Sequence, residues 1–170
     1  MKLLQGKYGV VTGGGSGIGR AICHRLAEHG ASIMVVDKNE KSAEQVYKSL
    51  VIKSKGESKH SWFKCDVSRS NQVKSLVEFT TERFGNTPNI IVNSAGTIND
   101  SLLVNMTEGQ FSNVIDVNLK GTFLVRSHIF HSLEFMTRTA VFLSDILPHY
   151  QRCVSMTNER RWYTNIQEKI

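Results

Sequence analysis

The residues best suited to chemistry form a glycine-rich stretch near the N-terminus, residues 12–19. It follows a short apolar run, residues 8–11, and precedes an amphipathic run, residues 20–27. Glycine lets a backbone turn sharply and lets a phosphate group approach the main chain. The N–H groups and positive dipole end of a helix that begins here would face that phosphate. A strand, glycine-rich turn and helix in this order predict a pyrophosphate-binding loop, with contacts from Gly13, Gly15, Ser16, Gly17, Ile18 and Gly19.

An acidic residue, Asp37, follows the second apolar run, residues 32–36. It lies roughly 20 residues past the glycine stretch, where a dinucleotide-binding fold places the carboxylate that binds the adenosine ribose. A carboxylate accepts hydrogen bonds from ribose hydroxyls but repels the 2′-phosphate of NADP, and Lys38 offsets that repulsion only in part. The pattern therefore favours NAD over NADP. The alternative role for Asp37 is the N-cap of a helix that starts near Asn39.

Apolar runs and helical patterns alternate four times along the chain. The expected strands are residues 7–11, 32–36, 60–64 and 89–92, and the expected helices are residues 17–29, 40–53, 70–84 and 107–130. This alternation predicts an α/β fold of the Rossmann-like type, with a parallel sheet covered by helices on both faces. The expected strand order is 3-2-1-4, with a ligand at the carboxyl ends where the order reverses. Residues 139–143 are a candidate fifth strand.

Small and polar residues follow the third and fourth expected strands. Asp66 and Val67 come after the third strand, and Asn93, Ala95 and Gly96 come after the fourth. Because the carboxyl ends of parallel strands share one edge of a sheet, these residues extend the predicted cofactor site. Asp66 has two open roles, contact with adenine or capping of the helix at residues 70–84.

Composition excludes several other functions. The chain has 170 residues, 40% of them hydrophobic and 21% charged, and a net charge of +6. No apolar stretch approaches the ~20 residues that a membrane span needs, and the scattered basic residues form no nucleic-acid motif. Three widely spaced cysteines give no disulfide framework or metal pattern, which favours a reducing compartment. His128 and His131 share a helical face but lack a third ligand, so no metal site is predicted.

Together these motifs resemble the short-chain dehydrogenase/reductase family. The resemblance rests on the glycine stretch, on Asp37, and on residues 65–67, 93–96 and 117–122. Asn118 matches a family asparagine that supports the catalytic residues through a backbone contact and a bound water. Within the family, residues 97–103 and 118–125 are most similar to 3-oxoacyl-carrier-protein reductases and to the animal 17-beta-hydroxysteroid dehydrogenase type 8 branch.

That resemblance implies further properties. Members of the branch are NAD-dependent enzymes of the mitochondrial matrix that act on 3-oxoacyl chains and steroids, and they assemble into tetramers with a partner subunit. The helix at residues 107–130 would face a neighbouring subunit in a homo- or hetero-oligomer. Because the glycine motif starts at residue 12, no room is expected for an N-terminal import signal, so the cytoplasm is the alternative location.

The resemblance stops near residue 127. Family members continue with a catalytic serine and then a Tyr-x-x-x-Lys pair, whose tyrosine protonates the carbonyl oxygen. No tyrosine of this chain has a lysine four residues later. Of the catalytic group only Asn118 remains, and Ser144, after the candidate fifth strand, is interpreted as a chance serine.

The sequence divides into residues 1–130, the Rossmann part, and residues 131–170, a divergent tail. All 13 glycines lie at or before Gly121, so the composition changes in the tail. We expect this tail to be poorly structured, or one strand plus a helix, and to arise from an alternative transcript or gene-model end. Two functions are then open: an NAD-dependent oxidoreductase whose 170-residue chain lacks activity, or a non-catalytic NAD-binding or interaction subunit.

Overall fold

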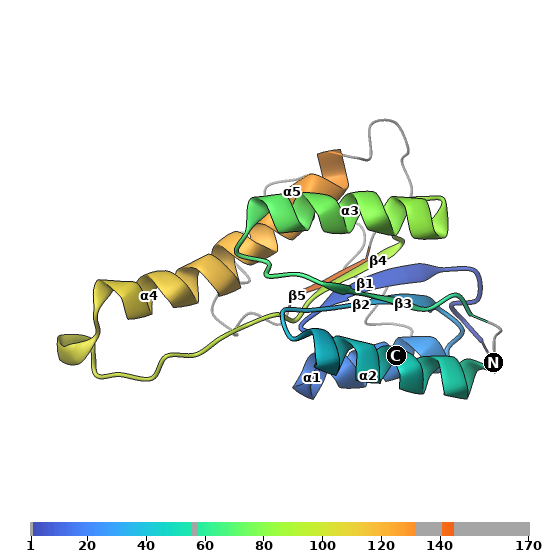
Figure 1. Cartoon of the computed structure of the whole chain (residues 1–170), viewed down its shortest axis with the longest axis horizontal. Helices are drawn as coiled ribbons and strands as arrows, with labels where there is room; N and C mark the ends of the chain where they lie inside the picture. Colours follow the sequence, from blue (N-terminus) through green and yellow to red (C-terminus); the bar gives the residue numbers. More distant parts are fainter. Residues whose placement is uncertain (1, 56–57, 132–140, 145–170) are drawn as a thin grey trace, which may run out of the picture.

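Five parallel strands form a single sheet in the computed structural model, which describes residues 2–55, 58–131 and 141–144 (Figure 1). The strand order is β3-β2-β1-β4-β5, so the predicted order 3-2-1-4 is confirmed, as is the Rossmann-like class. The order in which the strands are added reverses between β1 and β4, which leaves a crevice at the carboxyl ends of these two parallel strands. The strands are β1 Tyr8–Thr12, β2 Ser32–Asp37, β3 Ser61–Lys64, β4 Ile90–Asn93 and β5 Val141–Ser144.

Helices cover both faces of the sheet, as predicted. α1 (Gly17–Glu28) and α2 (Glu40–Ser54) lie on one face, while α3 (Ser70–Phe84) and α5 (Thr122–His131) lie on the other (Figure 1). A Thr107 capping box begins α4 (Glu108–Ile115), which follows the short 3-10 turn Leu103–Asn105. The helical region expected at residues 107–130 is observed, and within it a π-helical segment, η2 (Asp116–Gly121), separates α4 from α5.

Alternate residues of the central strands point to opposite faces of the sheet and pack into two separate hydrophobic cores. Val11, Ile33 and Val35 pack with buried residues of α1 and α2. Val10, Met34 and Val36 pack with buried residues of α3 and α5. Both faces of each central strand are therefore apolar, which is why these strands read as continuous hydrophobic runs in the sequence.

A buried histidine holds the edge of the sheet. The His60 side chain is only 2% exposed, and its Nδ1 accepts a hydrogen bond from the Ile33 N–H of β2 at 3.2 Å. An imidazole that accepts through Nδ1 is neutral, with its proton on Nε2. Burial lowers the pKa of His60 below its ordinary value of 6.5, because the apolar surroundings penalise the charged form.

We predict that the free energy of unfolding falls as the pH drops below about 6.5. The unfolded chain takes up a proton on residue 60 first, so acid favours unfolding until the pH passes the lowered pKa of the folded state. One such group contributes a slope of at most about 1.4 kcal/mol per pH unit. Denaturant unfolding at pH 5.5 and pH 7.5 measures this slope, which His60→Gln should reduce. His24→Gln, at a less buried position, should reduce it less, and an unchanged slope in His60→Gln would contradict the prediction.

Candidate functional site

The glycine loop after β1 is packed too closely to carry side chains at three of its positions, Gly13, Gly15 and Gly19. Gly13 has φ +66°, and a Cβ there would lie 2.8 Å from the backbone of Ala95, in the segment after β4. A Cβ on Gly19 would collide with the carbonyl oxygen of Gly13. Gly13 and Gly19 therefore let the loop, the β4 end and α1 approach one another at van der Waals distance.

The other half of the loop faces open space. Gly17 has φ +47°, and no atom lies within 4 Å of the position a Cβ would take. Ser16 is the N-cap of α1 but makes no side-chain capping hydrogen bond, and the neighbouring Ile18 is 64% exposed. The first turn of α1 thus presents backbone N–H groups and a small hydroxyl to the outside, an arrangement suited to a phosphate group.

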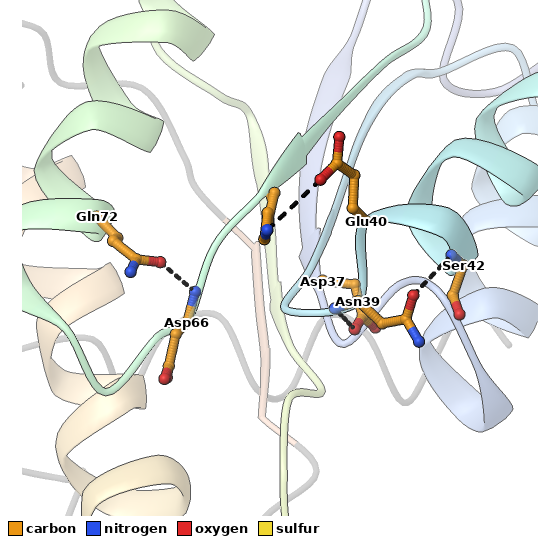
Figure 2. Close-up of polar contacts among 7 residues, drawn as sticks. Asp37, Asn39, Glu40, Ser42, Asp66 and Gln72 are labelled. Carbon is orange, nitrogen blue, oxygen red and sulfur yellow. Dashed lines mark hydrogen bonds and ion pairs between the residues drawn. The ribbon is translucent and has the colours of Figure 1, made fainter.

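Asp37 ends β2 and binds the glycine loop directly. Its Oδ2 accepts a hydrogen bond from the Gly15 N–H at 3.0 Å, and its Oδ1 accepts one from the Asn39 N–H at 2.9 Å. The capping role considered for Asp37 is wrong, because the N-cap of α2 is Asn39, whose side chain accepts from the Ser42 N–H at 3.2 Å (Figure 2). The carboxylate is instead oriented at the mouth of the loop.

Asp66 lies beyond the end of β3 and shapes the turn before α3. Its Oδ1 accepts hydrogen bonds from the Ser68 N–H and hydroxyl, at 3.0 and 2.7 Å, and its N–H donates to the Gln72 side chain at 2.8 Å (Figure 2). The N-cap of α3 is Arg69, so of the two roles left open for Asp66 the capping of this helix is wrong, and contact with adenine stays a prediction. The next residue, Val67, is buried against Gly121 of η2, where a Cβ would lie 2.6 Å from Val67 Cγ2.

The β4 end is tied to β1 through a hydroxyl. Thr12 Oγ1 accepts a hydrogen bond from the Ala95 N–H at 3.2 Å and donates to the Val92 carbonyl at 3.4 Å. Asn93 pairs with Thr12 in the sheet and is 5% exposed. Thr12 was not among the predicted site residues, although its place at the head of the glycine motif is the signal that identifies it.

Asn118 joins η2 to the segment after β4. Its Oδ1 accepts from the Thr97 N–H at 2.8 Å, and its Nδ2 donates to the Thr97 carbonyl at 3.0 Å. A Cβ on Gly96 would lie 3.6 Å from Asn118 Oδ1. Asn118 therefore makes a backbone contact of the kind expected from the resemblance, while a role in catalysis stays a prediction.

The structure also describes Ser144 and His128, two candidates from the sequence that lie outside the glycine loop and its neighbours. Ser144 ends β5 in register with Asn93, at the same edge of the sheet as the glycine loop. His128 contacts the Leu124 carbonyl and the Ser70 hydroxyl, at 2.9 and 3.4 Å. Among residues 2–55, 58–131 and 141–144, no three His, Cys, Asp or Glu side chains are placed to hold a metal ion. The divergent tail predicted at residues 131–170 lies outside the described residues, except for residue 131 and residues 141–144.

The structure brings the predicted residues after β1, β2, β3 and β4 to one edge of the sheet. Cys23 and Cys65 are buried, and burial raises the pKa of each thiol to about 12, so neither is a nucleophile at neutral pH. The site at this edge consists of the glycine loop after β1, the Asp37 carboxylate bound to that loop, and the turn after β3 that contains Asp66. Such a site can bind an extended nucleotide across the crevice.

Comparison with known sequences agrees with this geometry. The family described as "short chain dehydrogenase" matches residues 7–140. Zerumbone synthase from Zingiber zerumbet is 38% identical over 127 residues, which are 74% of this chain and 46% of that protein. Human (3R)-3-hydroxyacyl-CoA dehydrogenase is 37% identical, covering 72% of this chain and 48% of the enzyme. The 3-oxoacyl-[acyl-carrier-protein] reductase FabG of Chlamydia muridarum is 38% identical, and the match covers 75% of this chain and 50% of that reductase.

Solved structures share the same fold. The citronellol catabolism dehydrogenase AtuB of Pseudomonas aeruginosa has a TM-score of 0.74 and 34% identity, covering 83% of this chain and 56% of that one. NAD+-bound xylitol dehydrogenase has a TM-score of 0.71 and 28% identity, and the match covers 75% of this chain and 48% of that one. The chain thus spans about half the length of the relatives it matches.

Proposed function

This chain belongs to the short-chain dehydrogenase family, and on that premise we propose that residues 1–130 bind NAD for an oxidoreductase reaction. The observation that carries the proposal is the Asp37 carboxylate, which is bound to the Gly15 N–H beside the exposed first turn of α1. A pyrophosphate on that turn would leave the adenosine ribose at Asp37. Contacts are proposed from Gly13, Gly15, Ser16, Gly17, Ile18 and Gly19, and from Asp37, Asp66, Val67, Asn93, Ala95 and Gly96.

The preference for NAD over NADP rests on charge. The Asp37 carboxylate accepts hydrogen bonds from both ribose hydroxyls when these are free, and it repels a phosphate on the 2′ oxygen. When bound, NAD would supply the hydride-accepting ring. The chain's own residues hold and orient the nucleotide, and Asn118 fixes the segment after β4 through Thr97.

We predict saturable binding of NADH to the purified 170-residue chain, weakened about tenfold or more in Asp37→Ala. Hydrogen bonds to a charged group contribute about 1.5–3 kcal/mol each, so their loss is measurable. Nicotinamide fluorescence reports the dissociation constant. Glu78→Ala is the control, since Glu78 lies on α3 away from Asp37, and its exposed carboxylate pairs with Lys74. Equal affinity in Asp37→Ala, or no saturable binding by the unmodified chain, would overturn the proposal.

The acid–base half of the family reaction is proposed to be missing from these 170 residues. The sequence has no Tyr-x-x-x-Lys pair, so no side chain is identified that protonates a carbonyl oxygen during reduction. The substrate class proposed for the parent enzyme is a 3-oxoacyl thioester or a steroid, in the mitochondrial matrix or, alternatively, in the cytoplasm. Among the described residues, no helix is long and apolar enough to cross a membrane.

We predict that the chain by itself does not oxidise NADH in the presence of an acetoacetyl thioester. Removing the acid and its supporting lysine from such a site is expected to reduce the rate by a factor of 10² or more. Absorbance at the nicotinamide wavelength measures the rate, and a full-length family reductase is the positive control. Turnover above the rate without protein would contradict this prediction.

The alternative is a non-catalytic interaction subunit, and an exposed apolar surface favours it. Phe111, Ile115, Leu119 and Phe123 recur every four residues through α4, η2 and α5, and are 56%, 37%, 44% and 64% exposed. This spacing places them along one side of the helical region. A contiguous apolar strip of this kind is typical of a subunit interface.

We predict that the chain self-associates or binds a longer family subunit through this strip. Phe123→Glu should shift the sedimentation pattern towards monomer, because a carboxylate at the interface must be desolvated. Ile98→Glu, an exposed apolar position outside α4, η2 and α5, is the matched control. A wild-type chain that sediments as a monomer alone and in a mixture with a family reductase would exclude the interface.

A further inference from the structure

An open hollow of about 710 Å³ lies beside Asp37, at the start of α2. Six residues line it: Lys38, Asn39, Glu40, Lys41, Glu44 and Lys64. Asn39 connects the hollow to the proposed ribose site, because its N–H donates to Asp37 Oδ1 at 2.9 Å. Lys64 borders the hollow from the neighbouring strand, since it is the sheet partner of Asp37 in β3. The hollow therefore adjoins the place where the ribose 2′ oxygen would lie.

The charges in this hollow oppose one another. Lys38, Lys41 and Lys64 together would attract a 2′-phosphate, and they lie at the positive end of α2, which favours an anion further. Glu40 counteracts them, because its Oε2 forms an ion pair with Lys64 Nζ at 3.5 Å, drawn in Figure 2. The two side chains are 54% and 61% exposed, so this pair is accessible to solvent and to ligand.

We propose that Glu40 is a second determinant of nucleotide choice, acting together with Asp37. Glu40 pairs with the Lys64 ammonium and adds its own negative charge to the hollow, which reduces the attraction of the three lysines for a 2′-phosphate. The inference rests on the proposed function, because it concerns the ribose end of the same cofactor site. It means that an NAD preference does not depend on Asp37 alone.

Glu44 provides a matched control in the same helix. It lines the same hollow one turn further along α2, but its carboxylate pairs with Lys48 at 2.9 Å rather than with Lys64. Replacing Glu44 removes one negative charge without releasing Lys64. A comparison of the two positions therefore separates the Glu40–Lys64 contact from the general charge of the surface.

The experiment measures dissociation constants of NADH and NADPH for the 170-residue chain and for Glu40→Gln, Glu44→Gln and Glu40→Gln/Lys64→Ala. Glu40→Gln should lower the dissociation constant of NADPH, relative to that of NADH, by about two- to fivefold. This is the range expected for one exposed ion pair. This gain in relative affinity for NADPH should diminish with added salt. It should be absent from Glu44→Gln and lost in the double variant. The ratio of the two constants is unaffected if a variant is partly unfolded.

The outcomes separate this inference from the proposed function. Saturable NADH binding with an unchanged ratio in Glu40→Gln would overturn the role of Glu40 and leave the NAD site standing. The same shift in Glu44→Gln, or a gain that survives Lys64→Ala, would also overturn it. If the unmodified chain binds neither nucleotide, the proposed function fails, and this inference fails with it.

Discussion

The close approach of three backbone segments is the constraint on which the candidate site depends. The loop after β1 lies against the segment after β4 at Gly13, and against the start of α1 at Gly19, with no space for a Cβ at either contact. The Thr12 hydroxyl fixes the same segment through the Ala95 N–H. Because of this packing, the first turn of α1 and the ends of β1 and β4 share one crevice.

The same packing couples the loop to the second strand. Gly15 donates its N–H to Asp37, and a Cβ at Gly15 would lie 2.9 Å from that carboxylate oxygen. The carboxylate is therefore oriented before any ligand arrives, which lowers the entropic cost of binding a ribose. One side chain links the part of the site suited to pyrophosphate with the part suited to ribose.

The sheet order and all four helical regions could be predicted from the sequence, because their apolar periodicity is regular and their ends carry glycine or polar residues. The π-helical segment inside the fourth region was not predicted. A π-helical segment needs one extra residue in a turn, and the pattern around Asn118 reads as ordinary helix. Helix capping was an open alternative for Asp37 and Asp66 because each precedes a helix, whereas the observed N-caps are Asn39 and Arg69. The Thr12 contact and the Glu40–Lys64 ion pair join elements far apart in sequence, which no local pattern specifies.

Selectivity at a nucleotide site is better treated as a sum of charges than as the effect of one residue. At the proposed ribose end of this site, Asp37 is engaged by two backbone N–H groups, so part of its hydrogen-bonding capacity is already used. Three lysines beside it would weaken its rejection of a 2′-phosphate if they were unopposed. The ion pair between α2 and β3 offsets that effect from outside the glycine motif. In the proposed complex, the field at the 2′ oxygen would therefore depend on how α2 and β3 pack beside β2, as well as on the residue that ends β2.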